Sequence, residues 1–234
     1  MEIKQFVWDV VDSNSWLMEE DGHGLLIDAV DSQLLYKEIL RLTDLTVILT
    51  HAHFDHIVGL NKVRELMPNT AVIATENCSA YLGNIYRNMS ATAAAFMTFY
   101  AGGGKDCREI PPFTCGRADR TFEERMELDW RGHRIRLEAF HGHSVDSLIA
   151  VVDDTDMFSG DTLLSIPTVT RFPGGSTKRF WEEDVPRLEA MDVVSVFPGH
   201  GQVGGKDGMI QGNYLTRKGR GGNVKPASGD KRME

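Results

Sequence analysis

The stretch Thr50-His51-Ala52-His53-Phe54-Asp55-His56 holds three imidazole rings and one carboxylate within six consecutive residues. It directly follows Leu45-Thr46-Val47-Ile48-Leu49, an apolar run that predicts a buried strand. Imidazole is the usual protein ligand for zinc and similar divalent ions, and carboxylates complete such sites. A lone histidine is more often structural, but four such side chains at one strand end fit neither a core nor a solvated surface. The stretch therefore predicts a metal site.

The composition indicates one globular domain. The chain has 234 residues, of which 41% are hydrophobic, and this is enough for one substantial core. A formal net charge of −9 argues against a general nucleic-acid-binding or anionic-membrane surface. The three cysteines form no C-x-x-C pair, which favours free thiols in a reducing compartment. Because the first residues lack the pattern of a signal peptide, we expect a cytoplasmic protein.

Apolar alternation and helical periodicity predict strands and helices through both halves of the chain. The expected strands cover residues 3–11, 15–18, 24–29, 45–49, 71–74, 126–130, 134–140, 148–152, 157–159 and 193–197. The expected helices cover residues 32–42, 57–66, 76–87 and 178–191. This mixture predicts sheets covered by helices in an α/β (α+β) domain of residues 1–216.

Two stretches stand apart from this pattern. Residues 91–115 are rich in Ala, Met and aromatics and then contain a run of glycines. They fit either a flap that places Phe96 and Tyr100 over a pocket or a segment packed on the core. Residues 217–234 are basic and glycine-rich, which predicts a disordered tail, with a phosphate-binding arm as the alternative.

Further ligand-type side chains follow other expected strands. His143 lies in Phe140-His141-Gly142-His143-Ser144, Asp161 follows Ser159-Gly160, and His200 lies in Pro198-Gly199-His200-Gly201. A glycine beside each of them lets the backbone turn where a larger residue would block a metal or substrate.

The four segments, in this order and each at a strand end, resemble the metallo-β-lactamase superfamily and in particular its glyoxalase II-like branch. The resemblance covers residues 14–201 and implies a four-layer αββα sandwich with the site at one edge of two sheets. It also implies an aspartate behind the ligands, Asp28, that steadies the histidine loop, although Asp28 also fits a simple turn or cap. The implied ligands are His51, His53 and His143 for a first ion, Asp55, His56 and His200 for a second, and Asp161 as a bridge.

Such a centre implies hydrolytic chemistry. Two divalent ions about 3.5–4 Å apart can share a hydroxide near neutral pH and polarise a carbonyl or phosphoryl oxygen. Asp55 is then placed to orient the hydroxide or to accept its proton, and Asp161 to hold both ions. We therefore expect a binuclear metallohydrolase, most simply with zinc but also with iron or manganese, that acts on a thioester, lactone or related ester. The expected partner is a small-molecule substrate, with neither nucleic acid nor membrane, and the chain fits a monomer or a homodimer.

Other activities remain open at this point. A persulfide dioxygenase-like oxidoreductase uses a related framework with one iron held by two histidines and an aspartate. Phosphodiesterase or β-lactamase activity is less well supported, because zinc β-lactamases typically place another residue where Asp161 stands. A metal-binding sensor or scaffold is a further alternative.

Some residues have two interpretations. His141 stands where the family usually has proline, and it fits either a substrate-facing acid or base or an inert loop residue. Arg171 opens a stretch that resembles a glyoxalase-like segment, and it fits either a site for a substrate anion or a structural ion pair. His23 and His133 lie in turn-like sequence, and we expect them to be exposed and without a role.

Overall fold

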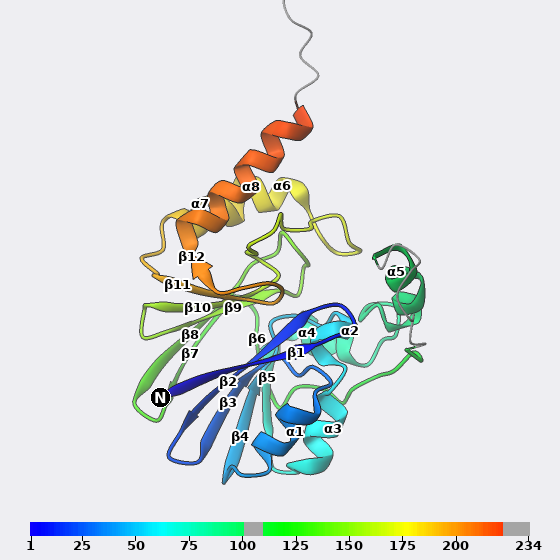
Figure 1. Ribbon diagram of the computed structural model, residues 1–234, viewed down its shortest axis with the longest axis vertical. Coiled ribbons are helices and arrows are strands. Elements are labelled where there is room, and N and C mark those ends of the chain that lie inside the picture. The colour runs from blue at the N-terminus through cyan, green and yellow to red at the C-terminus, as the bar shows by residue number, and fades with distance from the viewer. Residues whose placement is uncertain (101–109, 222–234) are drawn as a thin grey trace, which may run out of the picture.

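Two β-sheets lie face to face, with helices on both outer sides (Figure 1). The structure is a computed structural model that describes residues 1–100 and 110–221. Among these residues six strands form each sheet, in the order β1-β2-β3-β4-β5-β6 and β12-β11-β10-β9-β8-β7. This arrangement confirms the mixed α/β fold of the αββα type.

The strand directions bring several strand ends to the same edge of each sheet. In the first sheet β3 to β6 run parallel, and in the second sheet β8, β10 and β11 share one direction. The first sheet contains β1 (Glu2–Trp8), β2 (Ser13–Glu20), β3 (His23–Ile27), β4 (Asp44–Ile48), β5 (Ala71–Thr75) and β6 (Arg120–Phe122). The second contains β7 (Arg125–Trp130), β8 (His133–Ala139), β9 (Leu148–Val152), β10 (Asp156–Gly160), β11 (Ser195–Pro198) and β12 (Gly204–Gly205).

Both faces of the central strands are buried, because each sheet packs on the other sheet and on its own helices. In β3, Leu25 lies in the core between the sheets, whereas Leu26 lies in the core beneath the helices of the first sheet. In β9, Ala150 faces the first sheet and Val151 faces the helices of the second. Since successive side chains of a strand point to opposite faces, nearly continuous apolar runs are what this double burial requires.

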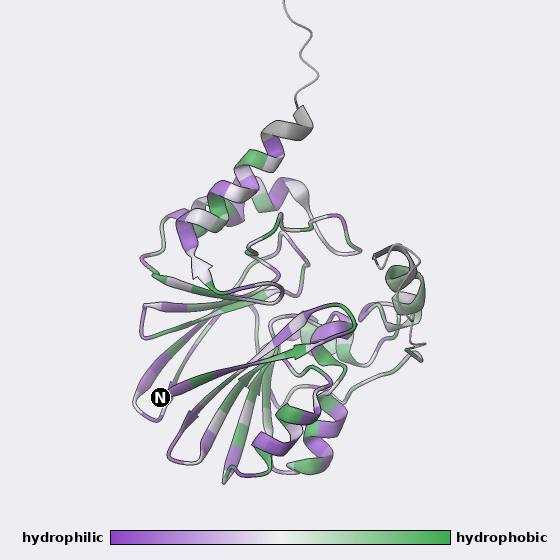
Figure 2. Ribbon diagram, in the orientation of Figure 1, coloured by the Kyte–Doolittle hydropathy of each residue, from purple (hydrophilic) through white to green (hydrophobic). Residues whose placement is uncertain are grey.

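The helices divide between the two sheets. Packed on the first sheet are α1 (Gln33–Ile39), α2 (Phe54–Ile57), α3 (Leu60–Leu66) and α4 (Glu76–Leu82). Packed on the second are the π-helical turn η2 (Phe180–Asp184), α7 (Val185–Glu189) and α8 (Lys206–Gly221), and the short helix α6 (Thr177–Arg179) leads directly into η2. Figure 2 shows that α1 and α3 carry both hydrophilic and hydrophobic residues, as expected for helices with one face on a core. None of the helices that the structure describes has the length and hydrophobicity needed to traverse a bilayer.

Several expected boundaries are wrong. The helix expected over 178–191 is broken into α6, η2 and α7, and the helix expected over 76–87 ends at Leu82. The strands β6 and β12 and the helix α8 have no counterpart among the expected elements. The glycines of α8 lower its helix propensity, and Met209 and Ile210 hold it on the second sheet through tertiary packing. The helix α8 continues to Gly221, residues 222–234 lie outside the described part, and the domain boundary expected at residue 216 stays a prediction.

The segment 91–115 is described only in part. It contains the end of η1 (Ser90–Thr92) and the helix α5 (Ala93–Tyr100), while residues 101–109 lie outside the described residues. Met97 packs in the core of the first sheet, as the packing interpretation expected. Cys78 and Cys115 are buried free thiols, and Cys107 lies outside the described residues.

Candidate metal centre

The strand ends bring the ligand-type side chains to one place. His51 and His53 lie in the loop after β4, and α2 carries the next two, while the others follow β8, β10 and β11. The seven side chains that the sequence predicted as ligands all take part in groups whose ligand atoms are within 4.8 Å of one another. These groups are His51–His53–His143, His51–His56–Asp161 and Asp55–His56–His200.

Two of these groups correspond to the two predicted ion sites. In the first, Nδ1 of His53 is 3.1 Å from Nε2 of His143. In the second, Oδ2 of Asp55 is 3.2 Å from Nε2 of His200 and 3.6 Å from Nε2 of His56. Each group therefore presents three donor atoms at the short mutual distances that a shared ion requires.

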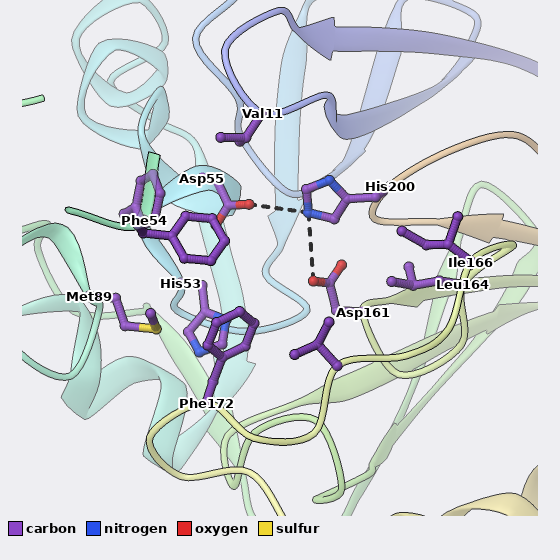
Figure 3. A pocket seen from close by; sticks show the side chains of 12 residues that line it. Val11, His53, Phe54, Asp55, Met89, Asp161, Leu164, Ile166, Phe172 and His200 are labelled. Atoms are coloured by element: carbon purple, nitrogen blue, oxygen red, sulfur yellow. Dashed lines mark ion pairs between the residues drawn. The ribbon is translucent and has the colours of Figure 1, made fainter. Parts of the chain in front are cut away.

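Asp161 lies between the two groups. Its Oδ1 is 3.5 Å from Nε2 of His56, and its Oδ2 is 3.7 Å from Nε2 of His143 and 3.6 Å from Nε2 of His200. Figure 3 shows that the carboxylates of Asp55 and Asp161 both lie beside the same nitrogen of His200, Nε2. One carboxylate thus faces ligand atoms from both groups, as a bridging ligand must.

The donor set fits a divalent metal. Buried polar atoms normally have a hydrogen-bond partner, and leaving one without a partner costs about 1–3 kcal/mol. Four buried atoms of this cluster have no such partner among the described residues. They are Nε2 of His51, His53 and His56 and Oδ1 of Asp161. Imidazole nitrogen with carboxylate oxygen is the donor chemistry that zinc, iron and manganese accept.

Asp28 orients two of the histidine rings. Its Oδ2 accepts hydrogen bonds from Nδ1 of His56 at 2.9 Å and from the hydroxyl of Thr50 at 2.7 Å, and its Oδ1 accepts from the Thr50 backbone N–H at 2.7 Å. Because the Thr50 hydroxyl gives its proton to Asp28, it accepts from Nδ1 of His51 at 3.0 Å. Both rings are thereby held with Nε2 toward the centre of the cluster.

The His143 ring is oriented by the backbone. Its Nδ1 lies 2.6 Å from the carbonyl oxygen of Val169, which can only accept, so Nδ1 carries the proton and Nε2 offers a lone pair. Asp146 ties this loop to the loop after β4, because its carboxylate accepts from the Ala52 N–H at 2.8 Å and from the Ser144 hydroxyl. The cluster is therefore held by hydrogen bonds from several elements.

A glycine is required next to the cluster. A Cβ atom on Gly199 would lie 2.3 Å from Oδ1 of Asp161 and 2.7 Å from Cε1 of His56. Real Cβ atoms do not approach so closely, so any side chain at this position would displace a ligand. This agrees with the expectation that glycines beside the ligands allow close approach.

Burial and charge set the pKa values in the cluster. Burial is the largest influence on His53 and His143 and lowers the pKa of each to about 4, so both rings are neutral near pH 7. Burial also disfavours the charged form of His56, but Asp55 and Asp161 with Asp28 outweigh it and raise the pKa of His56 to about 10. A proton and a divalent ion therefore compete for Nε2 of His56.

One anchor of the site was missed by the sequence analysis. The side chain of Asn14 donates to the carbonyl oxygens of Pro198 at 2.9 Å and Gly201 at 3.0 Å, and its backbone N–H donates to Gly199 at 2.7 Å. The first sheet thus fixes the loop that carries His200. The sequence signal that could have revealed this anchor is the run of three polar residues, Ser13-Asn14-Ser15, and the structure shows that all three are buried.

An apolar pocket opens beside the cluster (Figure 3). The space between its walls is about 540 Å³ and includes a part that is open to solvent. Its polar lining consists of His53, Asp55, Asp161 and His200. The remaining lining is apolar and comes from Val11, Phe54, Met89, Phe96, Leu164, Ile166, Val169 and Phe172.

The residues that the sequence proposed for substrate lie in different places. Phe96 lines the pocket, whereas the side chain of Tyr100 lies outside the described part. His141 is not among the lining residues, and its Nδ1 donates to the carbonyl oxygen of Val145 at 2.7 Å. Arg171 lines a separate hollow on the other side of Val169.

His23 and His133, which we expected to be exposed and without a role, are only partly exposed, and each contacts a carboxylate. Nδ1 of His23 lies 2.7 Å from Asp44, and His133 contacts Asp153 at 2.5 Å and Glu20 at 3.1 Å. Carboxylates at the neighbouring strand ends attract these imidazoles and hold both rings against the surface.

A family model described as the metallo-beta-lactamase superfamily matches residues 8–200. The chain belongs to this superfamily. The match confirms the family that the four ligand segments indicated, which is one of metallohydrolases that bind divalent metals.

Relatives and solved structures of this superfamily are similar to the chain. A hydroxyacylglutathione hydrolase from Glaesserella parasuis is 21% identical over 81% of this chain, which spans only 66% of that relative's length. The crystal structure of the BLEG-1 B3 metallo-beta-lactamase has a TM-score of 0.72 and 23% identity, covering 92% of this chain and 99% of that one. TTHA1623 in a di-iron-bound form has a TM-score of 0.66 and 22% identity, covering 91% and 99%. At these identities the likeness of structures concerns the fold.

Proposed function

We propose that the chain is a two-metal hydrolase that cleaves a thioester, lactone or related ester. The observation that carries this proposal is the cluster of buried donor atoms without hydrogen-bond partners at the end of the apolar pocket. The proposed ligands are His51, His53 and His143 for one ion, Asp55, His56 and His200 for the other, and Asp161 for both.

The chemistry of the donors supports zinc as the first candidate. Neutral imidazoles with carboxylates suit zinc, although iron and manganese bind the same donors and availability decides among them. The similar structure of TTHA1623 is described as di-iron-bound, so iron belongs in the test.

Divalent ions held by these residues would activate water and stabilise the negative charge that develops on the substrate's carbonyl oxygen. Asp55 borders the pocket and, while holding an ion, would orient the water or accept the proton that the water loses. Burial raises the pKa of Asp55, but His56 and His200 outweigh burial and hold it below its usual value, so the carboxylate is ionised near pH 7. In the net reaction the water oxygen bonds to the acyl carbon, the C–S or C–O bond breaks, and the departing sulfur or oxygen takes a proton.

Asp28 is a positioning residue in this proposal. It contacts His56 directly and His51 through Thr50, and it is not among the residues that line the pocket. Its role is therefore to keep two Nε2 atoms facing the ions.

The proposal is tested by metal analysis combined with turnover. Purified protein should contain about two divalent ions per chain. Removal of the ions with a chelator should abolish hydrolysis of thioester and lactone substrates, and added zinc, iron or manganese should restore it. A β-lactam and a phosphodiester in the same panel establish which bond is cleaved. Full turnover by protein that holds no metal contradicts the proposal.

The same measurements separate the oxidoreductase alternative. A protein that holds about one iron per chain and consumes dioxygen with a persulfide substrate has the chemistry of that alternative. Metal content without turnover of any of these substrates indicates a sensor or scaffold instead.

A further inference from the structure

We propose that the pocket beside the metal centre selects substrates whose acyl group is an uncharged alkyl or aryl chain. This inference rests on the proposed function, because it names the substrate class of the same site. The proposed substrate class differs from the one in the name of the relative, hydroxyacylglutathione hydrolase. The acyl group in that name carries a polar hydroxyl, whereas the class proposed for this chain has an apolar acyl group.

The walls of the pocket are aromatic on the side of the first sheet. The Phe172 ring lies 5.6 Å from the His53 ring and 5.5 Å from the Phe96 ring, and Phe96 lies 6.2 Å from Phe54. These are edge-on contacts at distances typical of packed aromatic pairs. A chain that enters the pocket therefore meets a preformed apolar surface directly beside the proposed ligands.

Met89 extends this surface through an unusual backbone. It adopts φ 62°, a conformation that residues other than glycine rarely take and that costs about 1–3 kcal/mol. Its neighbour Asn88 holds the turn, because the Asn88 side chain donates to the carbonyl oxygen of Phe113 at 2.9 Å. The strained turn puts an apolar side chain into the pocket wall (Figure 3).

The rim of the pocket is apolar as well. Ile166 is 48% exposed and Val169 is 43% exposed, and both line the pocket. Apolar side chains this exposed at the mouth of a site gain from contact with an apolar ligand. The apolar surface thus continues from the metal centre outward to solvent.

Charged groups are kept out of this pocket. Among the described lining residues, the charged or ionisable ones are the four proposed ligands, and no lysine or arginine is present. The nearby cations Arg171, Lys178 and Arg217 line the separate hollow beyond Val169. A carboxylate on the acyl chain would therefore be buried without a partner, which is strongly unfavourable. Biological thiols are polar, so the apolar pocket suits the acyl side of the scissile bond.

Chain length is the quantity that tests this inference. Burial of one methylene contributes about 0.8 kcal/mol, so kcat/KM should rise about fourfold for each added methylene. The substrates are acetyl, butanoyl, hexanoyl and octanoyl thioesters of N-acetylcysteamine, a small uncharged thiol, acting on the metal-loaded full chain. A flat profile, or a dependence on the alkyl chain of the leaving thiol instead, overturns the inference.

A matched pair tests the exclusion of charge. Butanoyl and succinyl thioesters of the same thiol differ mainly by a terminal carboxylate, and the succinyl ester should react at least about tenfold more slowly. Equal or faster turnover of the succinyl ester contradicts the inference.

A binding measurement separates the inference from the proposed function. The corresponding N-alkyl amides, titrated calorimetrically into the protein, should bind with a dissociation constant that falls with chain length and with a negative heat-capacity change. If the amides bind in this way and no ester is hydrolysed, the proposed function fails while the inference stands. If esters are hydrolysed without chain-length dependence, the proposed function stands and the inference about the acyl group fails.

Variants at the rim of the pocket test whether the rim causes the dependence of kcat/KM on chain length. Ile166→Asn should reduce the dependence of kcat/KM on chain length, because it removes apolar surface at the mouth of the pocket. Leu215→Asn is the matched control, since Leu215 is 68% exposed and does not line the pocket. The control should keep the wild-type dependence, and an unchanged dependence in Ile166→Asn contradicts the assignment of the rim.

Discussion

The histidines at the two ends of the sheets have opposite environments. His143 follows the C-terminal end of β8 and His56 lies in α2, which comes after β4, and both side chains are fully buried. His23 and His133 begin β3 and β8 at the other end, and their side chains are 26% and 23% exposed. The same residue type thus occurs in a buried cluster and at a partly exposed edge.

What separates the two ends is whether each nitrogen has a partner. Both ring nitrogens of His133 lie against carboxylates, from Asp153 and Glu20. At the other end Nε2 of His51 and of His56 has no hydrogen-bond partner among the described residues. Unpartnered buried nitrogens, more than histidine itself, therefore indicate a ligand site, and partnered ones indicate a contribution to stability.

The largest effect is expected from Asp161→Asn. The amide keeps the shape of the side chain but removes the charge that faces both donor groups, so kcat/KM should fall by about two to three orders of magnitude. Turnover and metal content are measured on the same preparation, with His133→Gln as the control from the other end. Wild-type turnover in Asp161→Asn with unchanged metal content would show that Asp161 does not serve the reaction.

The second-largest effect is expected on metal affinity, in a comparison of the pairs Asp28–His56 and Asp44–His23. Asp28→Asn replaces the carboxylate behind His56 with a neutral amide that has only one acceptor oxygen, and it should lower metal affinity about 10-fold to 100-fold, as competition with a chelator measures. Asp44→Asn removes the equivalent partner of His23 at the exposed end and should leave metal affinity unchanged. Equal losses in the two variants would remove the distinction between the two ends.

The sequence predicted the cluster better than the pocket. His51 to His56 are local in sequence, and donor type with strand-end position was enough to group them with His143, Asp161 and His200. Met89 reaches the pocket wall from a segment whose own pattern gives no sign of it. In the glyoxalase-like stretch the sequence pointed to Arg171, whereas Phe172 is the residue that lines the pocket, because pocket shape arises from tertiary packing.

The fold, like the site, was predictable from the sequence only in part. The superfamily and its αββα arrangement were predictable from motif order, whereas α8 was not, since its glycines disfavour a helix until Met209 and Ile210 pack on the second sheet. The assignment of each ligand to an ion remains a prediction, as does the domain boundary.

A third variant tests the close packing at the buried end. In Gly199→Ala the new Cβ would overlap Asp161, so the free energy of unfolding should fall by about 1–3 kcal/mol and metal affinity should fall with it. Gly205→Ala is the control, because a Cβ there meets no atom within 4 Å. Denaturant titration and chelator competition measure the two quantities. Similar small changes in both variants would mean that the backbone at Gly199 yields without disturbing Asp161.

The smallest effect is expected at the partly exposed end of the sheets, where the contribution of His133 to the free energy of unfolding depends on pH. Asp153, with a further contribution from Glu20, raises the pKa of His133 in the folded chain above its usual value. A raised pKa stabilises the fold while the ring is charged, so the contribution is fully present below about pH 6.5 and is lost as the pH rises through the folded pKa. At this exposure the contribution is at most about 1 kcal/mol.

His133→Gln should therefore lower the free energy of unfolding more at about pH 6 than at about pH 9, as urea titrations of wild type and variant measure. Arg131→Gln is the control, because Arg131 pairs with Asp21 at the same end, and its guanidinium stays charged across this range. A loss in His133→Gln that is equal at both pH values would mean that His133 acts through packing on Trp130, whose ring it stacks against, and not through its charge.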